Sequence, residues 1–182
     1  MTEHPASVDD APAIAALIRS LAGPFLTSPD GTGADAFFES VSAAAIARYI
    51  ASPNFDYRVR VEDGGDEAVD GGVADRLVAI GAMRDGRHLY HLFVAPSHQG
   101  RGLARGLWTQ LRDAAAARGH AGAFTVNASL NAQAVYARFG FVPSGEVQRV
   151  HGIAFRPMIL EPAAAPAPSD EHAPVSPRSV HR

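Results

Sequence analysis

Hydrophobic positions along the chain change between the spacing of helices and the spacing of strands. Near the N-terminus, apolar residues such as Ile14 and Leu17 recur at helical spacing, which predicts a helix over residues 10–22. Residues 35–52 follow a helical spacing less regularly and stop before Pro53, so they predict one broken helix or two short ones. A glycine-rich loop is expected between these two helical regions.

Apolar and polar residues then alternate with the period of strands. Three strands are expected, over residues 55–63, 75–86 and 87–95. Asp85-Gly86 is a strong hairpin signal, so these strands should form an antiparallel meander. The acidic, glycine-rich stretch 64–72 is expected to be a mobile turn.

The helical period returns in the second half of the chain. Leu107 and Leu111 share one face of a helix that is expected over residues 100–119. The remaining expected elements are a strand over 123–128, a helix over 130–140, and strands over 141–150 and 153–160. A strand, a helix and a parallel strand normally connect in a right-handed crossover. The order of elements therefore predicts an α/β (α+β) fold with a mixed sheet and antiparallel flanks.

The composition predicts one folded domain over residues 1–160 and a disordered, Pro/Ala-rich tail over residues 161–182. The net charge of -3 gives no reason to expect nucleic acid as a partner. The chain has no cysteine, which excludes disulfides and thiolate sites and permits a cytoplasmic location. No apolar run of about 18 residues exists, so no membrane span is expected. All basic residues are arginine, and this pattern suggests a GC-rich bacterial genome.

The stretch "HLFVAPSHQGRGLARGLW" joins an apolar strand to a helix through a turn that carries glycines and arginines. The first amides of a helix have no internal partner, and glycine lets a ligand approach them closely. Arg101 and Arg105 add forked donors suited to phosphate, so the loop indicates a pyrophosphate site. The alternative is a loop with exposed arginines and no ligand. A P-loop would need a lysine, and a dinucleotide fingerprint would need glycine at Arg105.

The same loop contains Gln99-x-x-Gly102-x-Ala104 between a strand and a helix. A second motif lies downstream and consists of Ala132, Tyr136, Gly140 and Phe141. In this order and on these elements, the two motifs resemble those of the GCN5-related N-acetyltransferases (the GNAT superfamily). The resemblance covers roughly residues 6–160. It implies a mixed β-sheet that is splayed at its centre and flanked by helices, with acetyl-CoA as co-substrate and no metal.

The resemblance also implies where acetyl-CoA binds. The strands over 88–95 and 122–127 should separate at their C-terminal ends, and the pantetheine arm should lie along Leu92, Phe93 and Val94. The Val94 amide would polarise the thioester carbonyl. The pyrophosphate should lie on Gln99, Gly100, Arg101, Gly102, Leu103, Ala104 and Arg105. Many family members carry an asparagine where this chain has Ser129, so Ser129 or Asn127 should take over its contact with the cofactor.

Tyr136 occupies the position of the family's usual general acid, which protonates the departing thiolate of coenzyme A. A phenol is protonated at neutral pH and can donate a proton. From periodicity alone, Tyr136 would be a core residue beside Val135 and Phe139. Direct attack of an amine on the thioester needs no enzyme nucleophile, which is consistent with a chain without cysteine.

A base or a water relay must deprotonate the amine. His88 is the best candidate because it lies where some relatives carry a catalytic glutamate, and histidine titrates near neutral pH. Otherwise it is a strand-surface histidine. His91 should face the other way in a regular strand, although a bulge near Val94 would change that. His98 is expected beside the phosphate loop, and the histidines form no metal-binding signature.

The expected activity is transfer of an acetyl group to a primary amine on a small molecule or a peptide. Two alternatives remain: a non-catalytic acyl-CoA-binding regulatory module, against which Tyr136 argues, and an acyltransferase that uses a longer acyl chain. The family recognises its acceptor through residues 22–50 and the last hairpin. These segments are mostly apolar and indicate a small or modestly polar amine rather than a polycation. A protein lysine, an amino acid, a polyamine and an antibiotic all stay open as acceptors. The chain is expected to be a monomer or a homodimer.

Overall fold

The backbone of the protein is organised around one mixed β-sheet, which the computed structural model describes for residues 1–62 and 77–162. The strands of this sheet are β1 (Thr2–Pro5), β2 (Phe55–Val61), β3 (Leu77–Arg84), β4 (His88–Val94), β5 (Phe124–Ala128), β6 (Val142–Pro143), β7 (Gln148–Val150) and β8 (Ile153–Leu160). Their spatial order is β1-β2-β3-β4-β5-β8-β6, with β7 paired to β8. The four strands β1 to β4 form an antiparallel meander, and β5 runs parallel to β4.

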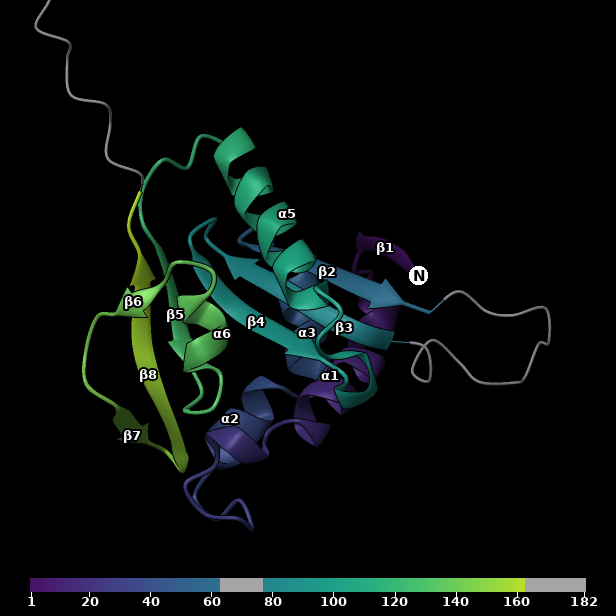
Figure 1. The fold of residues 1–182 in the computed structure, drawn as a ribbon. Coiled ribbons are helices and arrows are strands. Elements are labelled where there is room, and N and C mark those ends of the chain that lie inside the picture. Colours follow the sequence, from purple (N-terminus) through teal and green to yellow (C-terminus); the bar gives the residue numbers. More distant parts are fainter. Residues whose placement is uncertain (63–76, 163–182) are drawn as a thin grey trace, which may run out of the picture.

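Helices cover both faces of this sheet (Figure 1). They are α1 (Ala11–Ser20), α2 (Asp35–Ser40), α3 (Ala43–Ala51), α5 (Leu103–Ala117) and α6 (Gln133–Ala137). Short 3-10 turns lie at Val8–Asp10, Gly23–Phe25 and Pro96–His98. Helices α1 and α3 pack on one face, whereas α5 and α6 pack on the other, so the sheet separates two hydrophobic cores.

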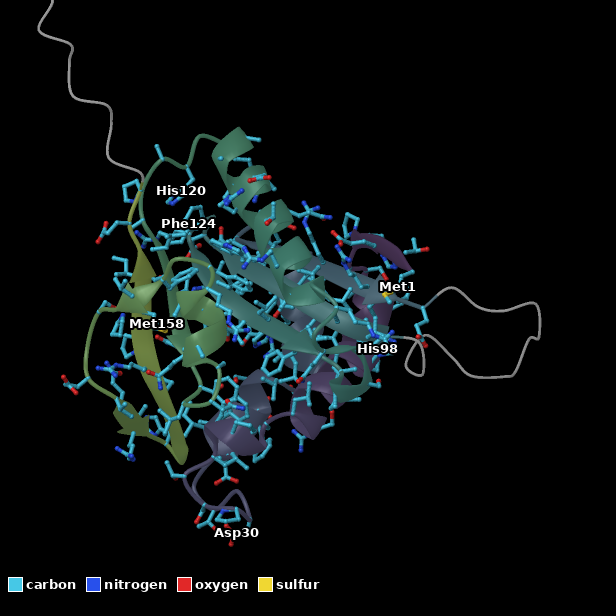
Figure 2. All side chains as sticks on the ribbon, viewed as in Figure 1. Met1, Asp30, His98, His120, Phe124 and Met158 are labelled. Atoms are coloured by element: carbon cyan, nitrogen blue, oxygen red, sulfur yellow. The ribbon has the colours of Figure 1, made fainter. Side chains whose placement is uncertain are left out.

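Apolar burial explains why the helices dock where they do. On α1, Ile14 and Ile18 are fully buried and pack with Ile46 of α3 and Val59 of β2. On the other face, Phe124 and Met158, both labelled in Figure 2, belong to the core beneath α5. Burying one such side chain stabilises a fold by about 1.5–3 kcal/mol, which makes these contacts the main support of the sheet.

A glycine in β3 lets α5 approach the sheet closely. A Cβ at Gly81 would lie 3.0 Å from a side-chain atom of Leu111 and 3.2 Å from Leu107 Cβ. Helix α5, which follows the glycine-containing loop, is therefore held directly over β3 and β4. Its N-terminus is fixed relative to the end of β4.

Most predicted elements are confirmed, often with shorter bounds. The hairpin between β3 and β4 forms at Asp85 and Gly86, whose φ angles of 53° and 64° are the left-handed values that this tight turn requires. The helical region 35–52 is two helices, because Ser42 begins α3 by accepting a hydrogen bond from the Ala45 amide at 3.2 Å. The mobile turn expected at 64–72 and all but the first two residues of the expected tail lie outside the described residues.

Three expectations about the sheet and its helices need correction. Strand β1 was not predicted, because its sequence TEHP shows no alternation of apolar and polar residues. It forms by pairing with β2 at the edge of the sheet. Helix α6 has five residues, since the expected span of 130–140 also contains the turns on either side of it. The expected strand over 141–150 is two short strands, β6 and β7, on either side of Gly145.

Candidate functional site

The sheet opens between β4 and β5. These parallel strands pair only through His88 with Thr125 and Leu89 with Val126, after which they run apart (Figure 1). In the part of the chain that the structure describes, the remainder of β4 up to Val94 has no partner strand on this side. The splayed sheet expected from the motifs is therefore present, and an extended ligand could pair with the free edge of β4.

At one end of this opening lies the glycine-containing loop before α5. Gly100 and Gly102 have φ angles of 75° and 79°, and a Cβ on either would meet no atom within 4 Å. Gly102 begins the helix, whose first internal bond runs from the Gly106 amide to the Gly102 carbonyl at 3.0 Å. The amides of Leu103, Ala104 and Arg105 thus precede the first hydrogen-bonded turn, and they are free for an anionic group.

The polar side chains of this loop are partly engaged with the protein itself. Gln99 donates from its amide to the Val94 carbonyl at 3.1 Å, which ties the loop to the end of β4. Arg105 donates to the Arg138 carbonyl at 3.2 Å and lies over the Phe139 ring. Its guanidinium therefore braces α5 against the segment after α6, and Arg101 is also exposed beside the glycines. The anion site thus consists mainly of backbone amides.

A small pocket of about 180 Å³ lies where the two strands begin to separate. Its walls come from β4, β5, α2, α6, β8 and the 3-10 turn at Gly23–Phe25. His88, His91, Asn127 and Tyr136 are among the residues that line it. The pocket therefore brings together His88 and Tyr136, the two residues that were predicted to transfer protons.

A β-bulge in β4 brings both histidines into this pocket. Ala82 pairs with His91, but the next residue of β3, Met83, pairs with Leu89, so Tyr90 is the extra residue. Beyond a bulge the alternation of faces is reversed, which places His91 on the same side as His88. The regular-strand expectation that His91 faces the other way was wrong, and the bulge lies at Tyr90 rather than near Val94.

Burial keeps both histidines neutral at physiological pH. Burial, together with the charges of Arg84 and Arg87, lowers the pKa of His88 to about 4. The His88 Nδ1 shares a hydrogen bond of 2.8 Å with the Thr125 hydroxyl, across the point where the strands separate. Burial lowers the pKa of His91 to about 3, and its Nδ1 shares a hydrogen bond of 3.0 Å with the Tyr57 hydroxyl. Each ring is therefore uncharged at neutral pH and has one nitrogen that can accept a hydrogen bond.

Tyr136 reaches the pocket from α6. It is 7% exposed and packs edge-on against Phe139 and Phe141, as its periodicity predicts for a core residue. It also lines the pocket. Burial raises the pKa of its phenol above the ordinary value of 10, so the hydroxyl is protonated. Among the described residues the hydroxyl has no hydrogen-bond partner, which leaves it available to a ligand.

The remaining candidates lie around the opening. Asn127 is exposed at the end of β5 and lines the pocket. Ser129 is buried, and its hydroxyl donates to the Asn131 side-chain oxygen at 2.8 Å, so it shapes the turn before α6. His98, labelled in Figure 2, lies in the turn after β4 and bonds to Glu62 at 2.7 Å. Asn127 is thus better placed for ligand contact than Ser129.

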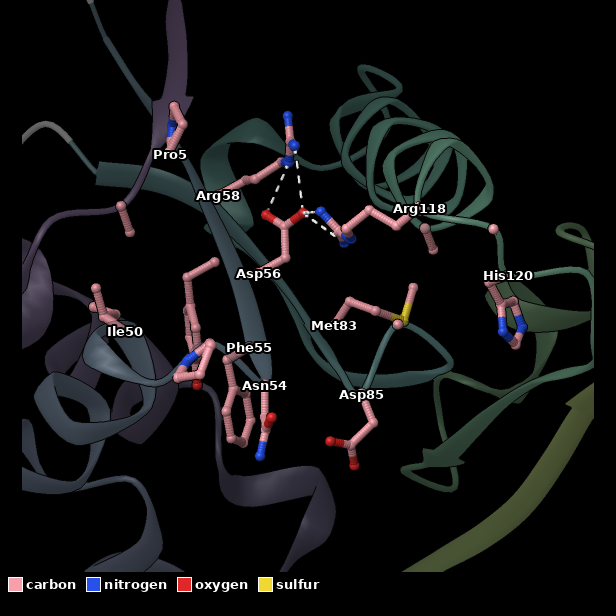
Figure 3. Close-up of a pocket in the computed structure, with 16 residues that line it drawn as sticks. Pro5, Ile50, Asn54, Phe55, Asp56, Arg58, Met83, Asp85, Arg118 and His120 are labelled. Atoms are coloured by element: carbon pink, nitrogen blue, oxygen red, sulfur yellow. Dashed lines mark hydrogen bonds and ion pairs between the residues drawn. The ribbon is translucent and has the colours of Figure 1, made fainter.

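A larger hollow of about 790 Å³ lies at the opposite end of α5 (Figure 3). Its main charged groups pair with each other, because Asp56 accepts hydrogen bonds from both Arg58 and Arg118 at 3.2 Å. Asp85 and His120 also line it. Neither motif contributes to this hollow, and it lies away from the free edge of β4. The small pocket is therefore the candidate active site.

Several pocket residues could not be identified from the sequence. Phe25, Phe37 and Phe155 come from three separate segments and meet only in the folded protein. The apolar character of residues 22–50 predicted an apolar acceptor region, but it did not indicate which of these residues would line the pocket. Among residues 1–62 and 77–162, no cluster of side chains suits a metal ion, and none of the helices described there is a candidate membrane span.

Comparisons with known proteins agree with this geometry. The acetyltransferase (GNAT) domain profile matches residues 25–162. A GCN5-related N-acetyltransferase from Rhodopseudomonas palustris has a TM-score of 0.66 at 21% identity, over 88% of this chain and 94% of that one. PaiA N-acetyltransferase from Thermoplasma acidophilum, solved with coenzyme A, has a TM-score of 0.62 at 13% identity, and the match covers 88% of this chain and 99% of that one. YncA from Salmonella typhimurium, solved with acetyl-CoA, has a TM-score of 0.59 at 18% identity, and the match covers 97% of this chain and 98% of that one. No curated protein sequence matches the chain.

Proposed function

Because the chain belongs to the GNAT acetyltransferases, we propose that it transfers an acetyl group from acetyl-CoA to a primary amine. One observation carries this proposal: the opening between β4 and β5 connects the glycine loop of α5 to the pocket that contains His88 and Tyr136. Acetyl-CoA supplies the activated thioester. The protein supplies an anion site, an extended edge and two groups that can move protons.

The residues of the opening fit acetyl-CoA. The free amides at Leu103, Ala104 and Arg105, with the open space at Gly100 and Gly102, suit a pyrophosphate. The unpaired edge of β4 over Leu92, Phe93 and Val94 suits the amide groups of pantetheine. Arg101 is exposed beside this loop and adds positive charge, while Asn127 faces the opening from β5.

Two pocket residues would transfer the protons of the reaction. His88 accepts a proton from the amine, directly or through a water, and the amine nitrogen attacks the carbonyl carbon of the thioester. The new carbon–nitrogen bond forms as the carbon–sulfur bond breaks, and the sulfur leaves with its electron pair. Tyr136 donates its phenolic proton to that sulfur. The products are an acetylated amine and coenzyme A, and no enzyme nucleophile is needed. The proton taken up by His88 then returns through solvent to the Tyr136 phenolate, which restores both groups.

The test measures coenzyme A release with a thiol reagent across a panel of amines, for the protein and for Tyr136→Phe. The chain has no cysteine, so the reagent reports only the product thiol. Loss of the general acid should lower kcat by about 10²-fold or more, while the affinity for acetyl-CoA is retained. Tyr49→Phe removes a phenol of α3 that does not line the pocket, and it should leave kcat nearly unchanged.

Two outcomes would contradict this function. Binding of acetyl-CoA without turnover on any amine would identify a regulatory module that senses acyl-CoA. Faster turnover with a longer acyl-CoA than with acetyl-CoA would identify an acyltransferase of different chain preference. Wild-type rates in Tyr136→Phe would remove Tyr136 from the role of general acid.

A further inference from the structure

The pocket that would receive the amine contains no fully charged side chain. Among the described residues that line it there is no Asp, Glu, Lys or Arg. The polar groups are those of Ser40, Tyr90, Asn127, Tyr136 and the two neutral histidines, and the other lining side chains are apolar. The nearby carboxylates lie outside this wall. Asp85, whose charge acts on His88, lines the larger hollow instead. Asp30 is at the tip of the loop that projects away from the sheet (Figure 2), and Glu39 is exposed on α2.

Aromatic rings make up much of this wall. Phe25 and Phe37 stack at 5.9 Å, and Phe25 also lies 6.0 Å from Phe93, so these rings form one continuous surface. Tyr90 and Phe155 extend the aromatic lining from β4 and β8. Such a surface favours an apolar or aromatic body. A second ammonium group would be buried without a counter-charge, which is strongly unfavourable.

The pocket is also small, and the loop after α1 that contributes to it is tied to β8. Its volume of about 180 Å³ lies below the range of about 300–1,000 Å³ that is usual for drug-sized ligands. The loop after α1 is fixed to the start of β8, since Leu26 bridges Ile153 and the Thr27 amide donates to the Gly152 carbonyl at 2.9 Å. A long or branched acceptor would have to separate this loop from β8.

We propose that the acceptor is a small primary monoamine carried on an aromatic or apolar body, and that polycationic amines are rejected. This inference rests on the proposed acetyl transfer. The neutral wall also helps the chemistry, because an apolar environment disfavours the ammonium form and so supplies the amine as the free base. A carboxylate in the wall would bind cationic amines more tightly but would hold them in the unreactive form.

The first experiment compares kcat/KM for 2-phenylethylamine, 1,5-diaminopentane and kanamycin at saturating acetyl-CoA. We expect 2-phenylethylamine to exceed the diamine by about 100-fold or more, because the diamine must bury an unpaired cation. Equal or higher values for the diamine or for kanamycin would overturn the inference, while leaving the proposed acetyl transfer intact. No turnover on any amine would overturn both.

A second experiment places a carboxylate in the wall. Ser40→Asp should raise kcat/KM for 1,5-diaminopentane relative to 2-phenylethylamine by about 10- to 100-fold, the effect of one charge-assisted hydrogen bond. Ser40 is the last residue of α2, and its hydroxyl donates to the Phe37 carbonyl at 2.7 Å. An unchanged preference in folded Ser40→Asp would overturn the role of the neutral wall.

Ser20→Asp is the matched control for that variant. Ser20 is likewise the last residue of its helix, and its hydroxyl donates to the Leu17 carbonyl at 2.8 Å, three residues earlier. Ser20 is exposed and lies outside the pocket. The Ser20→Asp variant therefore reproduces only the loss of stability caused by a negative charge at a helix C-terminus. Its preference among the amines should match that of the unmodified protein.

Discussion

The two ends of the opening between β4 and β5 are built from different parts of the polypeptide. At the α5 end, the site consists of backbone amides and two glycines with left-handed φ angles. At the pocket end, the site consists of side chains from η2 (Gly23–Phe25), α2, β4, α6 and β8. A cofactor common to a whole family can be held by backbone, whereas an individual acceptor must be selected by side chains. Substitutions at the α5 end should therefore lower the affinity for the cofactor, whereas substitutions at the pocket end should change the rate of the reaction or the KM for the amine.

The largest effect is expected at the pocket end from His88→Gln. Loss of the base should lower kcat/KM by about 10²-fold at neutral pH, with unchanged affinity for acetyl-CoA. The rate should recover in part at high pH, where free amine is present without the help of a base. Glutamine can still bond to the Thr125 hydroxyl, which keeps the local structure comparable.

His91→Gln separates the two histidines. His91 bonds to Tyr57 inside the core, and a smaller loss of rate is expected for this variant than for His88→Gln. A larger loss in His91→Gln would assign the base role to His91. Full activity in both variants would favour a water relay without either imidazole.

The next effect tests how the pocket wall is held. A Cβ at Gly152 would lie 2.4 Å from the Gly33 carbonyl carbon, and Gly152 has a φ of 71°. Gly152→Ala should destabilise the fold by about 1–3 kcal/mol through overpacking alone, and it should raise KM for the amine as the loop separates from β8. Thermal unfolding and amine kinetics measure the two effects.

Gly86→Ala gives the matched control for this substitution. Gly86 has a φ of 64°, but a Cβ there would meet no atom within 4 Å, so only the conformational cost remains. It should lower the Tm slightly and leave KM for the amine unchanged. An unchanged KM in Gly152→Ala would show that the contact between the loop and β8 does not shape the pocket.

The α5 end should respond to a glycine substitution with loss of cofactor affinity. Gly102→Ala places a methyl group in the open space beside the free amides, and affinity for coenzyme A should fall by about tenfold, the loss of one charge-assisted hydrogen bond. Gly119→Ala shares the positive φ and the open surroundings at the other end of α5. Both variants should lose similar stability, and only Gly102→Ala should lose affinity in calorimetric titration. Equal affinities would contradict a backbone anion site.

The same contrast explains how much the sequence could predict. The glycine loop, the hairpin at Asp85-Gly86 and the helix with Tyr136 were predictable, because each depends on residues close in the chain that serve one local conformation. The direction of His91 was not, since a bulge at Tyr90 leaves no mark in the hydrophobic period. The meeting of Phe25 with Phe93 depends on tertiary packing, so no local pattern encodes it.

The smallest effect concerns acid stability and tests the buried histidines of the pocket. The pKa of His91 is about 3 and that of His88 is about 4 in the folded protein, both well below the ordinary value of 6.5. At a pH between the pKa of each histidine in the folded protein and the ordinary value of 6.5, the unfolded chain binds more protons than the folded chain. The stabilising contribution is therefore complete above pH 6.5 and is lost as the pH falls toward 4 for His88 and toward 3 for His91.

For His91 alone, the free energy of unfolding should decrease by roughly 2 kcal/mol between pH 7.5 and pH 5, or about 4–8 °C in Tm. His91→Gln removes this titration but can still bond to the Tyr57 hydroxyl, so its Tm should fall less over the same interval. His4→Gln, on the edge strand β1, should retain the full decrease. If His91→Gln lost as much stability as the unmodified protein, His91 would not be held neutral, and the pocket wall would not exclude charge as strongly as the proposed selection of monoamines requires.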